Sequence, residues 1–538
     1  MTAKRLAIIG AGSSGLVTLK LAVERLPGWE IVCFEKGATT IGRWGNPYPG
    51  FVSTSTKYTT QFACHRKWDS HADPARRPSK GDFFHDDEFG RYLLDFVATH
   101  RLAPHIRLHT AIRRIARDPQ GWRLWIDDGT PREEVFDRLV ICTGLVEKMN
   151  ALETDIPHLT PDDPLPSGKT VVVFGGGESA ADFAHRLAAP ALGNRVYLSL
   201  KDGIRVSPRY HPIRGVPSDF LRNRLLLSIH PDLRNAIGQK FVEARIRHQQ
   251  KFEKIFKSRA PGPAPDDDFL AKRKFWDAKL TARAKDDLFN VFHTKSDGFL
   301  DDVAAGRIEI IGPPCDGSHR RFHDFDRTTT TIGIEPDLIC PMIGFRSGLA
   351  DLSGGEIQVG DFHLACLHAR HDDVFLVGFA RPIIGNIPSM SEMQAKLVTG
   401  ILSERHARPP DLATLHAASR AQLLRDFPTL NTETIHPVEM FPYCDHLARL
   451  MGSLPTLRKV GSLRRWLKVQ LAPASTLHYV DEDFDTREMD AQVIHSPPVI
   501  TALLLFIKLL LDLPYQVIKG PAARKNPQTS LSMASDRP

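Results

Sequence analysis

Two glycine-rich segments, far apart in the chain, have the spacing that binds the pyrophosphate of a dinucleotide. They are residues 10–15, with the sequence GAGSSG, and residues 175–180, with the sequence GGGESA. In such a turn the first glycine allows a tight bend, the second lets a phosphate approach the backbone, and the third position lets helix and strand pack closely. The amides at the start of the helix then face the phosphates. We predict that the cofactor phosphates are bound by Gly10, Gly12, Gly15, Gly175, Gly177 and Ala180.

The strand after the first turn ends in an acidic residue. Residues 31–34 form a short apolar run that leads into Glu35, 20 residues after Gly15. A carboxylate at this strand end accepts hydrogen bonds from a ribose diol and repels a 2′-phosphate. The first site is therefore expected to hold FAD or NAD rather than NADP. An ordinary surface glutamate is the alternative.

The strand after the second turn ends in hydroxyl-bearing and basic residues instead. Residues 195–200 form the expected strand, and the side chains that could reach a 2′-phosphate are Ser199, Lys201, Arg205 and Arg209. Cations and a hydroxyl at this place favour NADPH over NADH. For the single basic residues, a solvated basic loop is the alternative.

Each glycine turn lies between the elements that a Rossmann unit requires. Apolar runs precede the turns and helix-like stretches follow them, at residues 6–9, 169–174, 16–25 and 181–187. Further along, residues 136–144 and 337–344 each contain an Asp that leads an apolar strand ending at a glycine, Gly144 or Gly344. A glycine there lets the backbone pass close to a ligand, so both are predicted cofactor contacts. The pattern predicts an α/β fold with two Rossmann-like dinucleotide-binding domains.

Composition argues against several other classes of protein. The net charge of +7, from 70 basic and 63 acidic residues, is small for 538 residues, and no compact basic block indicates a nucleic-acid partner. The seven cysteines include no C-x-x-C pair, so no metal site and no dithiol centre are predicted. A sparse, odd number of cysteines fits a reducing compartment. With no signal peptide at the N-terminus, we expect a cytoplasmic protein.

The most apolar stretch of the chain lies near its C-terminus, at residues 498–513. A bilayer span needs about 20 apolar residues, whereas this run is shorter and contains Lys508. We therefore predict peripheral membrane contact by a helix that lies in the interface, helped by the basic residues Lys519, Arg524 and Lys525. A helix packed against the body of the protein is the alternative. The tail after Lys519 is expected to be disordered.

The order of these motifs resembles that of the flavin-containing monooxygenases, which are class B flavoprotein monooxygenases with two dinucleotide-binding domains. The resemblance extends over most of residues 4–480. Residues 41–50 resemble the family's G-G-x-W segment and downstream Tyr-Pro, residues 53–57 resemble its T-N-T-S-K stretch, and residues 385–388 with Gln394 resemble a segment of its second FAD-binding part. The family's F-x-G-x-x-x-H signature is missing, since Pro161–Gly168 takes its place, and Ile343 stands where the family has Thr.

The resemblance implies an NADPH domain inserted within the FAD domain. The expected segments are 1–150 for the first part of the FAD-binding domain, 151–345 for the NADPH-binding domain with a helical insertion at 211–290, 346–480 for the second part of the FAD-binding domain, and 481–538 for a C-terminal helical extension. The insertion is interpreted as a cap over the active site or a contact for a partner. A solvated charged face is the alternative. The sequence does not indicate an oligomeric state.

The resemblance also implies the chemistry. An enzyme similar to N,N-dimethylaniline monooxygenase would use FAD, NADPH and dioxygen to form a flavin hydroperoxide that oxygenates a small molecule, at N or S. By the family alignment, Thr54 takes the place of an Asn near the reacting flavin and is our candidate catalytic residue, while packing in the core is the alternative. The cofactor contacts implied are Arg43, Trp44, Asn386 and Gln394. A Baeyer–Villiger ketone monooxygenase, an NADPH-consuming flavin oxidase or reductase, and a non-catalytic membrane-associated binding protein are the alternatives.

Overall fold

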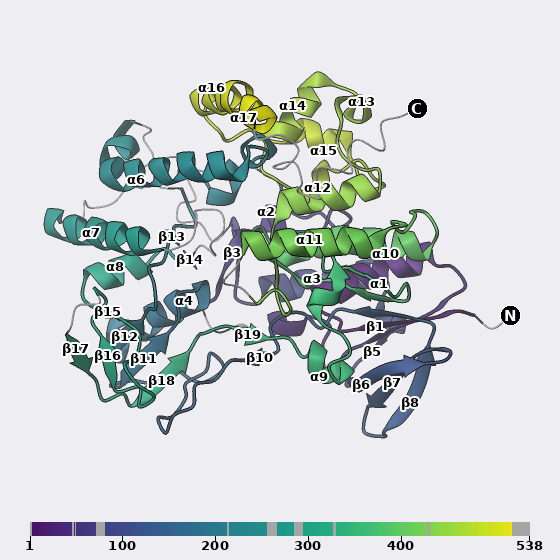
Figure 1. Cartoon of the computed structure of the whole chain (residues 1–538), viewed down its shortest axis with the longest axis horizontal. Helices are drawn as coiled ribbons and strands as arrows, with labels where there is room; N and C mark the ends of the chain where they lie inside the picture. Colours follow the sequence, from purple (N-terminus) through teal and green to yellow (C-terminus); the bar gives the residue numbers. More distant parts are fainter. Residues whose placement is uncertain are drawn as a thin grey trace.

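Two sheets built mainly from parallel strands lie side by side and organise the molecule (Figure 1). The computed structural model describes residues 3–518 except 46–47, 49, 71–80, 212–214, 256–265, 285–293, 327–329 and 428–430. The first predicted turn follows a strand of the larger sheet and the second follows a strand of the smaller one.

The larger sheet is built from both ends of the chain. Its order is β20 (Phe362–His363), β21 (Leu367–His368), β22 (Val374–Leu376), β9 (Arg138–Ile141), β1 (Arg5–Ile9), β2 (Glu30–Phe34) and β5 (Ile106–Arg107). β1 pairs in parallel with β2 and β9, and β9 pairs in parallel with β22. Because β22 comes from far beyond β9 in the sequence, the chain between them is inserted into this unit.

The inserted unit has a smaller, fully parallel sheet. Its order is β15 (Ile308–Ile311), β12 (Arg195–Ser199), β11 (Thr170–Phe174) and β18 (Leu338–Pro341). The strands predicted from apolar runs are thus present, with ends shifted by a few residues. Two short strands at the entry to and exit from the insert, β10 (Lys148–Met149) and β19 (Phe345–Arg346), pair with each other antiparallel. The two chain crossings between the units therefore lie together.

The remaining strands form small sheets of two or three strands. They pair β3 (Val52–Thr56) with β4 (Phe83–His85), β7 (Gly121–Asp127) with β6 (Ala111–Asp118) and β8 (Arg132–Phe136), β13 (Val206–Ser207) with β14 (Thr294–Lys295), β16 (Arg321–His323) with β17 (Thr331–Gly333), and β23 (Ala380–Ile384) with β24 (His436–Glu439). β13 and β14 belong to the insert, and Figure 1 places them beside β3 at the junction of the two units.

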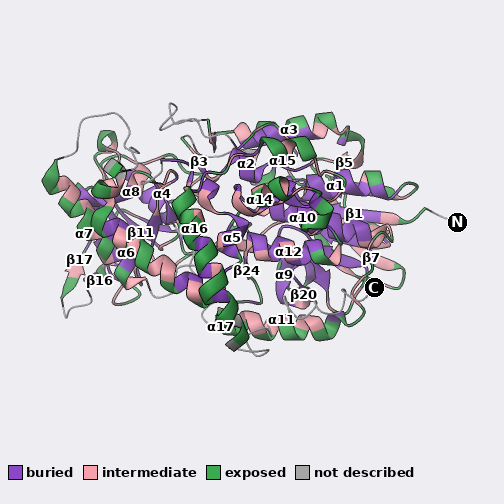
Figure 2. Ribbon diagram, turned by 90° about the horizontal axis from the view of Figure 1, so that it is seen from above, coloured by how far each residue is buried: buried purple, intermediate pink, exposed green. Residues whose placement is uncertain are grey.

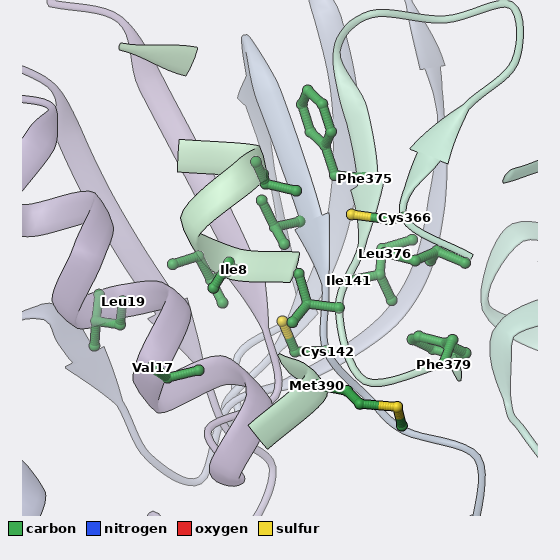
Figure 3. Packing of buried hydrophobic residues seen from close by; sticks show 14 of the residues in the cluster. Ile8, Val17, Leu19, Ile141, Cys142, Cys366, Phe375, Leu376, Phe379 and Met390 are labelled. Atoms are coloured by element: carbon green, nitrogen blue, oxygen red, sulfur yellow. The ribbon is translucent and has the colours of Figure 1, made fainter. Parts of the chain in front are cut away.

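Apolar side chains from both ends of the chain form the core of the larger unit. Helix α1 (Ser13–Arg25) follows the first glycine turn and packs against α10 (Ile387–Leu402) as well as β1 and β2. Figure 3 shows Ile8 and Val17 from the first segment in the same buried cluster as Cys366 and Met390 from the last. In the insert, α4 (Glu178–Leu187) and α8 (Phe299–Ala304) cover the smaller sheet around Phe183 and Phe299.

The predicted insertion at 211–290 contains two long helices. They are α6 (Pro231–Ile255), with a kink at His248, and α7 (Asp267–Arg283). The two helices pack on each other, and α5 (Arg224–Leu227) precedes them. The other helices are α2 (Lys57–Thr60), α3 (Glu88–Thr99), α9 (Leu349–Ser353), α11 (Leu412–Asp426), α12 (Met440–Leu450), α13 (Leu457–Val460), α14 (Leu463–Leu471) and α15 (Thr486–Ala491).

The apolar C-terminal run forms one continuous helical segment on the surface. It comprises α16 (Pro498–Phe506), a π-helical turn η8 (Ile507–Asp512) and α17 (Leu513–Ile518). Residues 498–515 are long and apolar enough to cross a membrane by length and composition, and only 11% of this stretch is buried. Figure 2 shows the helix as a largely exposed ridge. The alternative of a helix buried against the body therefore does not describe it. The predicted disorder after Lys519 lies outside the described residues.

Two histidines are buried without hydrogen-bond partners in the described part of the chain, His363 and His446. Their ring centroids are 5.9 Å apart. Burial lowers the pKa of His363 to about 3 and that of His446 to about 4. Both are therefore neutral in the folded protein at pH values where an unfolded histidine, with a pKa near 6.5, takes up a proton.

We predict that the free energy of unfolding falls as the pH drops from about 6.5 towards 4, since the unfolded state then binds more protons. His446→Phe should flatten this dependence, because it removes one of the groups that titrates only on unfolding. Urea midpoints measured between about pH 7 and pH 5 would test this. His158→Gln, at an exposed histidine, is the matched control. Equal slopes for His446→Phe and the original chain would contradict the prediction.

Candidate cofactor and active site

The first glycine turn is held by close backbone packing and by Glu35. A Cβ atom at Gly15 would lie 1.8 Å from the carbonyl oxygen of Gly10, so no side chain fits there. The buried Glu35 carboxylate accepts hydrogen bonds from the Ala11 amide at 2.8 Å and from the Gly37 amide at 2.8 Å. Its place at the end of β2, against the turn, fits the predicted ribose contact of a flavin dinucleotide.

Two neighbouring segments complete the surroundings of this turn. The short helix η1 (Gly42–Gly45) crosses it, with the Gly42 Cα 3.9 Å from where a Cβ on Gly12 would lie. Thr143, next to Gly144 after β9, has a buried hydroxyl without a hydrogen-bond partner in the described part of the chain. A buried polar atom without a partner costs stability, so a ligand that bonds to it fits here. These features make the turn a suitable site for FAD.

Trp44 and Arg43 belong to η1. The half-buried Trp44 ring packs edge-on against Phe89, with centroids 4.8 Å apart, and against Phe51 at 5.7 Å. The Trp44 ring thus has a packing role, and its contact with a flavin stays a prediction. The Arg43 side chain lies outside the described part of the structure.

The second glycine turn opens into a cavity of about 840 Å³. A Cβ on Gly175 would lie 2.3 Å from the Met342 carbonyl oxygen, whereas no described atom lies within 4 Å of a Cβ on Gly177. The backbone at Gly177 therefore faces open space that a phosphate could enter. Ala180 is buried in the first turn of α4, 3.7 Å from the same Gly175 position. The wall of the cavity includes Gly175, Gly176, Ser199, Lys201, Asp202, His323 and Ile343.

Of the four residues predicted to meet a 2′-phosphate, two line this cavity. The Lys201 side chain is exposed at its wall, and Ser199 is buried there with its hydroxyl donated to the Gly312 carbonyl at 2.9 Å. Arg205 and Arg209 are buried elsewhere, which differs from the expectation. Arg205 donates to Gln239 Oε1 at 2.8 Å.

Arg209 contacts strand β3 of the larger unit instead of the cavity. Its guanidinium donates to the carbonyl oxygens of Val52 at 2.7 Å and Ser53 at 2.9 Å, both in β3. Asp297 holds the same guanidinium at 3.3 Å. The physical reason is geometric: the chain lines the cavity as far as Ile204 and then turns away from it, so that Arg209 lies at the junction of the two units.

Asn386 and Gln394 both hold α10 in place through protein contacts. Asn386 caps the helix by accepting from the Ser389 amide at 2.9 Å and donates to the Thr59 carbonyl at 2.8 Å. Gln394 accepts from the Gly378 amide at 2.9 Å and donates to the Tyr443 hydroxyl oxygen at 2.7 Å. Any contact of these buried side chains with a cofactor stays a prediction.

Thr54 lies in the middle of β3, where the larger unit meets the insert. Its side chain is half-buried, and its hydroxyl makes no hydrogen bond within the described ranges. Its carbonyl oxygen accepts a hydrogen bond from Lys295 Nζ at 2.5 Å, and Ser55 donates to the Gly385 carbonyl at 3.4 Å. Thr54 thus lies at the junction between the first turn's unit and the second, which suits a residue near both cofactors.

Sequence reasoning missed several residues at these sites. Asp202 and His323 line the second cavity, Thr143 lies beside the first turn, and Lys295 contacts Thr54. The position of Asp202, directly after Lys201, was a signal that could have been used. The contact of Lys295 with Thr54 could not be predicted, because the two residues are 241 positions apart in the sequence.

The fold and the two turns define a flavoprotein with two dinucleotide-binding domains. Residues 3–285 match the model of the flavin-binding monooxygenase-like family. The chain belongs to this family, and it is a flavin-dependent monooxygenase whose cofactors are FAD and NADPH.

Known proteins with similar sequences or folds differ in their reactions. The 4-hydroxybenzoate brominase (decarboxylating) of Marinomonas mediterranea is 24% identical over 88% of each chain. Flavin-containing monooxygenase 5 of Rattus norvegicus is 27% identical over 46% of this chain and 50% of its own. The open crystal structure of cyclohexanone monooxygenase has 16% identity and a TM-score of 0.53, covering 84% of this chain and 98% of its own. The structural likeness supports the fold alone.

We predict that Gly177→Ala leaves the fold intact and weakens NADPH binding, because the added methyl group occupies the open space that a phosphate would enter. The dissociation constant for NADPH should rise about tenfold, or about 1.4 kcal/mol. Titration calorimetry on the FAD-loaded protein measures it. Gly175→Ala is the matched variant: its Cβ would meet the Met342 carbonyl and its φ is +117°, so it should lower the melting temperature. An unchanged dissociation constant for NADPH in Gly177→Ala would show that the phosphates do not bind at Gly177.

Proposed function

We propose that the chain is an FAD- and NADPH-dependent monooxygenase that inserts one oxygen atom into a small molecule at nitrogen or sulfur, in the manner of an N,N-dimethylaniline monooxygenase. The observation that carries the proposal is the pair of glycine turns, one against Glu35 and the other opening into a cavity with Lys201 at its wall. When bound, the two cofactors supply the reducing equivalents and the activation of dioxygen.

The chain's own residues then have to bind, orient and exclude water. The turn amides hold the phosphates, Glu35 holds a ribose, and Lys201 pairs with the 2′-phosphate. Thr54 offers one hydroxyl donor at the junction of the two units, which could position a reacting group or the nicotinamide amide. The described residues include no group of three or more His, Cys, Asp or Glu side chains that could hold a metal ion. A role for a metal ion is not proposed.

The reaction type has rivals among the relatives. A Baeyer–Villiger oxygenation of ketones, or NADPH oxidation without oxygen transfer, needs the same cofactors, and a non-catalytic binding protein would need the fold alone. A second candidate is bromination of a phenolic acid, because the match to the brominase spans 88% of this chain and the match to the rat monooxygenase only 46%.

Product analysis decides between these reactions. The FAD-loaded protein is supplied with NADPH and, in turn, a tertiary amine, a sulfide, a ketone, and 4-hydroxybenzoate with bromide. An N-oxide or sulfoxide formed in proportion to the NADPH used supports the proposal. A lactone or ester supports Baeyer–Villiger activity, and a bromophenol supports halogenation. Peroxide with every substrate would reject oxygen transfer.

We expect Lys201→Ala to reduce the preference for NADPH over NADH. A hydrogen bond to a charged group contributes about 1.5–3 kcal/mol, so the dissociation constant for NADPH should rise roughly tenfold to a hundredfold while that for NADH changes little. Both constants can be measured by fluorescence titration. Lys169→Ala, an exposed lysine just before β11 at the other end of the smaller sheet, is the control. Equal losses of affinity for NADPH and NADH would show that Lys201 does not bind the 2′-phosphate.

We also propose that the C-terminal helical segment contacts an anionic membrane surface while the body stays in the cytoplasm. The charged groups of the segment turn inward: Lys508 donates to the Ser228 carbonyl at 2.6 Å and pairs with the buried Asp512 at 2.7 Å. The outward side is apolar, with Val499 77% exposed and Leu509 and Leu510 each 58% exposed.

Helix α14 lies beside this segment and also exposes an apolar side chain, here next to basic residues. Both α14 and α16 pack on α5, and Figure 1 shows them together at one side of the molecule. Leu463 on α14 is 60% exposed, and the exposed basic residues nearby include Arg458 and Arg464. Exposed leucines next to basic residues suit the interface of an anionic bilayer.

Leu510→Glu should weaken binding to vesicles of phosphatidylserine and phosphatidylcholine by about tenfold, because a charge in the apolar interface has to be desolvated. Vesicle flotation measures the bound fraction. Leu424→Glu, at an exposed leucine of α11, is the matched control and should bind as the original chain does. If the original chain stayed with the soluble fraction at every vesicle concentration, membrane contact would be rejected.

A further inference from the structure

A two-residue strand of the insert connects the second glycine turn to the strand that carries Thr54. In β14, the buried Thr294 donates its hydroxyl to the Gly176 carbonyl at 3.0 Å, inside the second turn. The next residue, Lys295, donates to the Thr54 carbonyl at 2.5 Å. Two adjacent side chains thus extend from the cavity to the middle of β3.

The Lys295 ammonium is held in place by a buried carboxylate. Lys295 is 6% exposed and Asp219 9% exposed, and their side chains are 2.5 Å apart. The second oxygen of Asp219 accepts the Thr56 amide at 3.1 Å, at the end of β3. Asp219 lies in the short helix η5 (Ser218–Leu221) within the predicted insertion 211–290. The insertion therefore supplies a group that binds β3.

The insert binds β3 along almost its whole length. Arg209 bonds to the carbonyls of Val52 and Ser53, Lys295 to that of Thr54, and Asp219 to the amide of Thr56. On its other side β3 pairs only irregularly with β4, with a shift of register between Val52 and Thr56. The insert therefore contributes four hydrogen bonds to the position of β3, in addition to the pairing of β3 with β4.

We propose that Lys295 and Asp219 are positioning residues, which with Thr294 make the placement of Thr54 depend on nucleotide bound at the second glycine turn. Phosphates seated on Gly175–Gly177 restrain the turn, the restrained turn fixes β14 through Thr294, and β14 fixes β3 through Lys295. The coupling is reciprocal, so an ordered β3 also favours the bound nucleotide. The inference rests on the proposed function only in assigning NADPH to the cavity.

Hydrogen exchange tests the coupling without turnover. On the FAD-loaded protein, saturating NADP⁺ should slow amide exchange in a peptide spanning residues 50–60, as read by mass spectrometry. In Lys295→Met this slowing should be lost at saturating NADP⁺, with saturation established by calorimetry. Lys148→Met, which breaks the exposed pair with Asp351 at 2.7 Å, is the matched control and should keep it. The same slowing in Lys295→Met as in the original chain would overturn the proposal.

The double variant Lys295→Met with Asp219→Leu separates position from stability. Removing both buried charges avoids an unpaired carboxylate, so the double variant should regain the melting temperature that Lys295→Met loses. Its rate of flavin reduction by NADPH should still be lower by about tenfold, with the NADPH concentration for half-maximal rate changed less than about threefold. If the rate returned with the melting temperature, the pair would be structural only.

These outcomes are distinct from a failure of the proposed function. Hydrogen exchange and flavin reduction need neither dioxygen nor an oxygenated product. If the protein showed the coupling but formed no N-oxide or sulfoxide, this inference would stand and the proposed reaction would be rejected. If the protein oxygenated amines or sulfides but NADP⁺ had no effect on β3, the proposed reaction would stand and this inference would be rejected.

Discussion

At both glycine turns the backbone packs too closely to leave room for a side chain on Gly15 or Gly175, and this constraint shapes both candidate cofactor sites. At the first turn the Gly10 carbonyl occupies the space of a side chain on Gly15, and at the second the Met342 carbonyl occupies that of one on Gly175. The first of these carbonyls belongs to the turn itself, and the second follows the closing strand β18. The amides of the turn and of the helix start are then expected to face the phosphates. The phosphate sites follow from the packing of the sheets.

This constraint explains why the two turns were recognisable from sequence. The residues that make it up are local: a short apolar strand, a glycine at fixed spacing, and a helix that begins at once. The same locality let Glu35 and Lys201 be placed at strand ends, where the structure has them beside the first turn and the second cavity. That the strands next to each turn pair in parallel follows from the same rule, whereas the strand order and the antiparallel strands β20 and β21 of the larger sheet were not predicted.

Residues whose place depends on distant partners could not be predicted in the same way. Arg209 reads as a phosphate ligand because it is a cation soon after β12, yet its partners are carbonyls more than 150 residues earlier. Gln394 reads as a family cofactor contact, yet it bonds to Gly378 and Tyr443. The C-terminal run was expected to be too short for a span. The helix continues to Ile518, and the Tyr515 ring contacts His230 of the insertion, with ring centroids 5.1 Å apart.

The buried charges of Lys295 and Asp219 at the junction of the units are costly, because both groups lose their contact with water. A buried ion pair gains little over an apolar pair of the same volume, since both charges must leave water. The Lys295–Asp219 pair is therefore expected to add little to the stability of the contact between the insert and β3. What the charged pair provides, and an apolar pair would not, is direction: an ammonium that points at one carbonyl and a carboxylate that accepts one amide. Apolar surfaces can slide by an ångström at little cost, whereas these bonds cannot. At the junction where we propose that the half-buried Thr54 hydroxyl lies between the two cofactors, such directed bonds fix the register of β3, which an apolar contact would not do.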